Sequence, residues 1–110
     1  MKRYCLALDL KDDPELIKRY EDWHQHVWPE IIDSIRSSGI VSMQIYRISN
    51  RLFMIMEVND QFSFEAKAIL DNENEKVQEW EKLMWQFQKP LPFAKPGEKW
   101  ILMKEIFSLK

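Results

Sequence analysis

The chain has 110 residues, a formal net charge of −2 and a hydrophobic fraction of 45%, values that predict one ordinary globular domain over residues 1–110. Basic and acidic residues are interspersed, and no apolar run approaches the ~18 residues of a membrane span, so neither a nucleic-acid partner nor a membrane is expected. A single cysteine cannot form an internal disulfide, so the sequence predicts a cytoplasmic protein in which Cys5 is an inert thiol.

The first half of the chain predicts a strand followed by two helical segments. Alternating apolar residues over 4–10 are typical of a strand. An acidic cap followed by Pro14 starts a helix that should continue to about His24. Pro29 disfavours helical geometry at the residue before it and lacks a backbone donor, so a kink or short break is expected just before this proline. A second helical piece should then extend from Pro29 to Ser38.

The second half predicts a hairpin, two helices and a last strand. Alternation over 41–46 and 52–58, around a Ser49-Asn50 turn, is typical of two hairpin strands. The other expected elements are a short helix capped by Asp60 and interrupted at Asp71-Asn72, a longer helix from about Glu73 to Phe87, a proline-rich loop over 88–99, and a strand over 100–107.

This order of elements predicts an α+β fold. Two crossovers around a hairpin give a ferredoxin-like βαββαβ subunit, in which a four-stranded antiparallel sheet carries its helices on one face. The alternate positions of the strands are also partly apolar, and an apolar sheet face has to be covered. The simplest cover is a second copy of the same sheet, so a homodimer is expected.

Residues 20–30 form the most unusual segment, because they hold both histidines of the chain. Histidine has an unperturbed pKa near neutral pH, which makes it the natural proton-transfer side chain. Tyr20 and His24 are four residues apart and share a helix face. A tyrosine and a histidine with purely structural roles, the histidine hydrogen-bonded within the protein, would show the same spacing. His24 and His26 form a His-x-His pair, but residues two apart on a helix point in nearly opposite directions. There is no third histidine and the single cysteine is expected to be an inert thiol, so no metal site is expected.

Together these residues resemble the L-rhamnose mutarotase family. The matching pieces are Tyr20 with His24, Val-Trp-Pro-Glu at 27–30, the Gly39 turn, Ile45-Tyr46, Leu52-Phe53 through Glu57, and Trp80 in the second long helix. Two positions depart from the family pattern: His26 stands where a proline is common, and Glu81 stands where a second tryptophan is expected. The resemblance covers nearly the whole chain and implies a dimeric α+β barrel built from ferredoxin-like subunits.

The resemblance also implies a function. It implies an isomerase that interconverts the α and β anomers of a 6-deoxy hexose, L-rhamnose or a relative such as L-fucose, by general acid–base catalysis without a cofactor. His24 would be the principal proton-transfer residue and Tyr20 its hydrogen-bonding partner at the sugar. The implied sugar-binding residues are Trp80, as an apolar wall for the 6-deoxy face, with Tyr46, Glu81 and His26.

Two rival functions stay open at the level of sequence. Dimeric α+β barrels include small monooxygenases that act on aromatic polyketides or degrade haem, and a histidine in the cleft can ligate haem. A non-catalytic sugar-binding module would bind a deoxysugar and leave anomer exchange at its background rate. Fold alone separates none of these possibilities.

Overall fold

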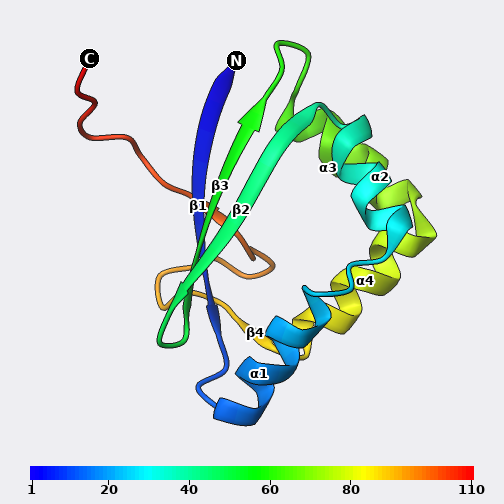
Figure 1. Cartoon of the computed structure of the whole chain (residues 1–110), viewed down its shortest axis with the longest axis vertical. Helices are drawn as coiled ribbons and strands as arrows, with labels where there is room; N and C mark the ends of the chain where they lie inside the picture. Colours follow the sequence, from blue (N-terminus) through cyan, green and yellow to red (C-terminus); the bar gives the residue numbers. More distant parts are fainter.

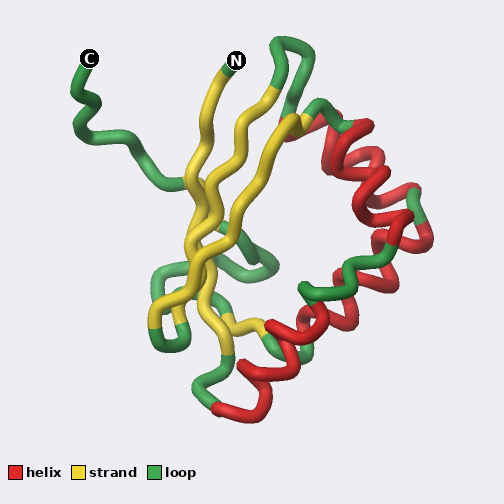
Figure 2. Tube along the Cα trace, viewed as in Figure 1, coloured by secondary structure: helices red, strands yellow, loops and turns green.

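The computed structural model describes residues 1–110, and its strands form one sheet with all the helices on one side (Figure 1, Figure 2). In chain order the elements are β1 (Lys2–Leu10), α1 (Pro14–Trp23), α2 (Pro29–Ser37), β2 (Ile40–Ile48), β3 (Arg51–Val58), α3 (Phe64–Glu73), α4 (Glu75–Trp85), β4 (Gln88–Lys89) and β5 (Ile101–Leu102).

The sheet has the order β2-β3-β1-β4, and β5 also pairs with β1. Strand β1 lies in the centre, with β3 antiparallel to it along almost its whole length, from Lys2 opposite Val58 to Asp9 opposite Arg51. Strands β2 and β3 form the predicted hairpin. The antiparallel order, with crossovers on one face, confirms the predicted ferredoxin-like arrangement.

The fourth strand of this arrangement is split into two short pieces along β1. Strand β4 places Gln88 opposite Leu10, and β5 places Leu102 opposite Leu6. Between them the chain leaves the sheet as a loop over residues 90–100. This loop contains three of the five prolines, and proline cannot donate the hydrogen bonds of a strand ladder.

The predicted strand over 100–107 is correct only for its first part. The backbone N–H of Met103 donates to the carbonyl of Cys5 at 2.7 Å, and pairing ends there. Residues 104–110 then extend away from the subunit as a C-terminal arm (Figure 1). The arm carries exposed apolar side chains that find no cover within the subunit: Ile106, Phe107 and Leu109.

The first two helices begin as predicted. The Asp13 carboxylate accepts hydrogen bonds from the backbone N–H groups of Glu15 and Leu16 at 3.0 and 3.1 Å, and Pro14 is the first helical residue. Helix α1 ends at Trp23, so the predicted break is confirmed but begins earlier than expected. Helix α2 begins at Pro29 itself.

The third and fourth helices are separated at a different residue from the one predicted. Ser63, not Asp60, caps α3, because its hydroxyl accepts from the backbone N–H of Ala66 at 3.2 Å. The interruption lies at Asn74, not at Asp71-Asn72. The Asn74 side chain accepts from two backbone N–H groups at the start of α4, and this local bonding stops α3 and starts the next helix.

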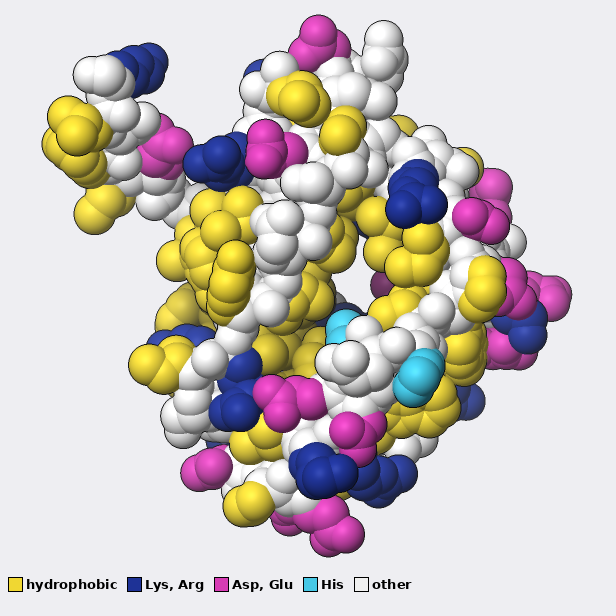
Figure 3. All heavy atoms as spheres, viewed as in Figure 1, with side chains coloured by type: hydrophobic (Ala, Val, Ile, Leu, Met, Phe, Trp, Pro, Cys, Tyr) yellow, Lys and Arg dark blue, Asp and Glu magenta, His cyan; other side chains and the backbone are white.

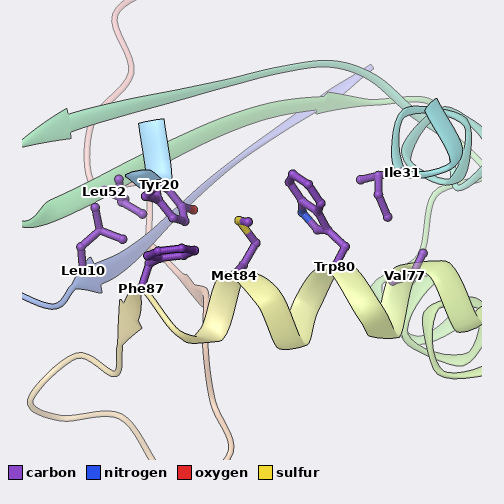
Figure 4. Packing of buried hydrophobic residues seen from close by; sticks show 8 residues of the cluster. All are labelled: Leu10, Tyr20, Ile31, Leu52, Val77, Trp80, Met84 and Phe87. Carbon is purple, nitrogen blue, oxygen red and sulfur yellow. The ribbon is translucent and has the colours of Figure 1, made fainter. Parts of the chain in front are cut away.

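The hydrophobic core lies between the sheet and the helices and consists of two clusters. The larger one joins β1 and β3 to α1, α2 and α4, and its eight buried members are labelled in Figure 4: Leu10, Tyr20, Ile31, Leu52, Val77, Trp80, Met84 and Phe87. The smaller cluster lies further along the sheet and contains Leu6, Ile40, Met54, Met56 and Val58. The other sheet face is not covered by any helix of the subunit (Figure 1).

Candidate functional site

A cavity of about 1330 Å³ lies between the sheet and the helices. Every helix and strands β1 to β4 contribute to its lining, and Figure 3 shows it as a hollow bordered by hydrophobic side chains. Ligand pockets are typically roughly 300–1,000 Å³, so this cavity has ample room for one monosaccharide and ordered water. The predicted pair Tyr20 and His24 both line it, as do Trp80 and Glu81 from α4.

His24 caps the C-terminal end of α1, and its ring is held by the helix itself. The ring Nδ1 lies 2.8 Å from the backbone carbonyl oxygen of Tyr20. A carbonyl can only accept a hydrogen bond, so Nδ1 must carry the proton. In the neutral imidazole the other nitrogen, Nε2, therefore keeps its lone pair and can accept a proton from a ligand. The half-buried position of His24 on the cavity lining leaves this nitrogen within reach of a bound molecule.

Tyr20 lies one helical turn earlier, with its ring centroid 4.5 Å from that of His24. Its side chain is only 3% exposed and belongs to the larger core cluster. Burial raises the pKa of Tyr20 to about 12, and a hydrogen bond from the side chain of Gln88 offsets part of that rise. The phenol is therefore protonated at neutral pH and is a hydrogen-bond donor. In Figure 4 its oxygen points into the space between the sheet and α4.

The raised pKa of Tyr20 predicts a pH dependence of stability. Because its pKa is about 12 in the folded chain and 10.0 ordinarily, the stabilisation is complete below pH 10 and is lost as the pH rises toward 12. In the wild type the unfolding free energy should therefore fall by up to about 3 kcal/mol between pH 10 and 12 because of Tyr20, and Tyr20→Phe should lack this contribution. Urea unfolding followed by circular dichroism measures it, with Tyr46→Phe as the control for loss of a phenol. Equal pH slopes in wild type and Tyr20→Phe would contradict the assignment.

Three tryptophans meet beside the histidine. The Trp80 ring lies 5.1 Å from that of Trp28 and 6.2 Å from that of Trp23, in edge-to-face arrangements, and 6.0 Å from the ring of His24. Trp28 is the residue just before α2, so the break ahead of Pro29 brings this indole onto α4. Of the three indoles, Trp80 lines the cavity, and there it forms an apolar surface next to His24 of the kind that sugar rings and methyl groups contact.

Polar side chains lie elsewhere on the cavity lining. Glu81 is half-buried, and Gln78 donates a long 3.4 Å hydrogen bond to its Oε2. Tyr46 reaches the cavity although 57% of its surface is exposed. Lys67 and Asp71 form an ion pair on α3, and both side chains line the cavity. These groups can donate to and accept from the hydroxyls of a sugar.

His26 is the one predicted site residue that does not line the cavity. It is exposed in the turn after α1, because a residue two positions from His24 projects away from the side that His24 presents. The sequence reasoning missed Gln88, which contacts the phenol of Tyr20 although the two residues are far apart in the chain. Nothing local to Gln88 indicates this partner. No three His, Cys, Asp or Glu side chains gather closely enough to hold a metal ion.

No helix has the length and apolar character needed to cross a membrane. Among proteins of known sequence, an L-fucose mutarotase from Xanthomonas campestris pv. campestris is 46% identical to this chain over 111 residues, covering 99% of this chain and 89% of the relative.

Two solved structures share the fold of this chain. An L-rhamnose mutarotase from Formosa agariphila superposes with a TM-score of 0.73 at 20% identity, covering 100% of both chains. A dimeric ferredoxin-like protein from an uncultured marine organism gives a TM-score of 0.53 at 13% identity, covering 98% of this chain and 91% of that one. A sequence profile described as L-rhamnose mutarotase matches residues 3–109. Because this match takes in every helix, all but the first residue of the strands and the whole cavity lining, the chain belongs to the L-rhamnose mutarotase family.

Proposed function

We propose that this protein is a mutarotase for a 6-deoxy hexose, with L-fucose as the first candidate substrate and L-rhamnose as the second. The observation that carries the proposal is the pairing of a histidine whose free nitrogen accepts a proton with a tyrosine that keeps its own, on one cavity wall. L-Fucose is placed first because the 46% identical relative is an L-fucose mutarotase.

Anomer exchange needs a base and an acid at the same time. His24 Nε2 takes the proton of the anomeric hydroxyl while the Tyr20 phenol gives its proton to the ring oxygen. The bond between the anomeric carbon and the ring oxygen breaks, and the anomeric carbon becomes an aldehyde. After the aldehyde rotates, both protons return and the ring closes on the opposite face. Each such group typically contributes ~10²–10⁴-fold, which suffices because sugars already mutarotate in water.

The remaining residues would hold the sugar. The indole of Trp80 faces the methyl group and the apolar side of the ring, and the half-buried Glu81 carboxylate accepts hydrogen bonds from hydroxyls. Tyr46 would contact the outer side of the sugar. A sugar contact for His26 stays a prediction, as does the cytoplasmic location inferred from the single cysteine.

Saturation-difference NMR of anomer exchange tests the function directly. The wild-type protein should accelerate exchange of L-fucose, more weakly that of L-rhamnose, and least that of their 6-hydroxy relatives L-galactose and L-mannose. Bound deoxysugar with exchange at the background rate would instead identify a binding module. A Soret band after adding haem, or oxygen uptake with a quinol, would identify a monooxygenase.

The working unit of this function is a homodimer. The strand positions between the buried ones, such as Phe53 and Ile55 on β3, face the side of the sheet that no helix covers. The apolar C-terminal arm leaves the subunit without a partner of its own. A second sheet stacked on this face would cover it, and a solved protein of the same fold is itself dimeric.

Charge placed on this face should separate the subunits. We expect wild-type protein to sediment at twice the 13.4 kDa subunit mass, and Ile55→Lys at the mass of one subunit, because a lysine cannot be buried unpaired between two sheets. Ile69→Lys, at an apolar side chain exposed on α3, is the matched control and should stay dimeric. A monomeric wild type, or a dimeric Ile55→Lys protein, would overturn the sheet-to-sheet dimer.

A further inference from the structure

Gln88 is the one buried polar residue that contacts the proton-transfer pair. Its side chain is 6% exposed, and its Nε2 lies 3.2 Å from the phenolic oxygen of Tyr20. Its backbone is anchored twice: β4 pairs Gln88 with Leu10, and the neighbouring carbonyl of Phe87 accepts from the backbone N–H of Lys11 at 2.9 Å. The amide therefore approaches the phenol from a fixed position on the cavity lining.

We propose that Gln88 is a positioning residue that directs the Tyr20 proton toward the sugar and stabilises the phenolate left after proton transfer. This inference rests on the proposed mutarotase function. An amide N–H that donates to the phenolic oxygen occupies one of its lone pairs. The phenolic hydrogen then has to point elsewhere, and Figure 4 shows the oxygen directed into the space between the sheet and α4.

The same bond becomes stronger during the reaction. When Tyr20 has given its proton to the ring oxygen, the phenolate is a buried charge, and a hydrogen bond to a charged oxygen is worth more than one to a neutral oxygen. Burial by itself raises the pKa of Tyr20, whereas the bond from Gln88 lowers it. Gln88 therefore offsets part of the rise in pKa that burial causes, so the phenol stays a stronger acid. An oxyanion-hole donor stabilises a developing negative charge in the same way.

Three variants test this role. They measure how much kcat falls when the Gln88 amide is removed, and whether that fall requires Tyr20. Gln88→Met keeps the side-chain length and removes the donor, so kcat for L-fucose exchange should fall about tenfold with KM little changed. In a Tyr20→Phe background the same substitution should have no further effect, since there is no phenol to act on. Gln86→Met, at an exposed position two residues earlier, is the matched control and should keep the wild-type kcat.

Two outcomes of these kinetics would overturn the proposal. Additive losses in the double variant would indicate a purely structural role for Gln88. A raised KM with unchanged kcat would make it a direct sugar contact. Gln88→Asn, whose amide is too short to reach the phenol, keeps a polar side chain at this buried site and should reproduce the loss if Gln88→Met folds poorly.

A second readout does not depend on catalysis. In protein labelled with fluorotyrosine, the ¹⁹F signal of residue 20 is assigned by its absence in Tyr20→Phe. Gln88→Met should raise the pKa of this phenol, and an unchanged titration would refute the hydrogen bond as a control of the acid. If wild-type protein fails to accelerate any sugar, the proposed function fails, but this titration still decides whether Gln88 tunes Tyr20.

Discussion

Replacing His24 by Ala is expected to remove most of the acceleration of anomer exchange, about 10²–10⁴-fold, while the subunit stays folded. The reason is chemical, because His24 is the only histidine on the cavity wall and its own hydrogen bond leaves Nε2 free to accept a proton. Saturation-difference NMR of L-fucose exchange measures the loss, and circular dichroism checks the fold.

A second substitution at His24 separates its chemistry from its structural bond. In His24→Asn the side-chain amide can still donate to the carbonyl of Tyr20, as Nδ1 does, but there is no nitrogen in the place of Nε2. This variant should therefore be as slow as His24→Ala and more stable than it. Exchange at the wild-type rate in either protein would remove His24 from the mechanism.

Replacing Trp80 by Ala is expected to cost about 3–5 kcal/mol of unfolding free energy, because the indole is a large side chain in the middle of the main cluster. It is 9% exposed and contacts two further tryptophans edge-to-face. Small domains have roughly 5–15 kcal/mol in total, so this loss approaches the limit that the fold tolerates. Urea unfolding measures the change.

Trp85 supplies the matched control for this prediction. It lies on the same helix but is 38% exposed, and Trp85→Ala should change the unfolding free energy by no more than about 1 kcal/mol. Trp80→Phe should retain much of the stability but weaken L-fucose binding, since the wall beside the histidine becomes smaller. Equal losses for the two alanine variants would mean that Trp80 is not the centre of the core.

Local chemistry made much of this molecule predictable from its sequence. The start of α1 follows from Asp13 and Pro14, whose effects act within one helical turn. The Tyr20–His24 spacing places both residues on one face, as the structure shows. The bond between them, however, is from the ring to a backbone carbonyl, a detail that depends on the helix ending at Trp23.

Features that depend on distant partners were not predictable in this way. The helix break fell at Asn74 because its side chain caps α4, whereas Asp71 is engaged in an ion pair with Lys67. The last strand ends after Met103 although the first residues of β1 stay unpaired on that edge, and the apolar alternation that predicted a longer strand does not record where the pairing stops. Gln88 on β4 contacts Tyr20 on α1, and no periodicity in the sequence records that contact.

The two halves of the proposed acid–base pair are secured by different means. The histidine is tethered to a main-chain carbonyl at the end of α1, which every amino acid at position 20 would supply. The phenol depends on its own side chain and on an amide from β4. The orientation of the His24 ring thus depends on the backbone at the end of α1. It should stay the same when a substitution at position 20 removes the phenol. A substitution at position 20 is therefore expected to change the acid and to leave the base in its place.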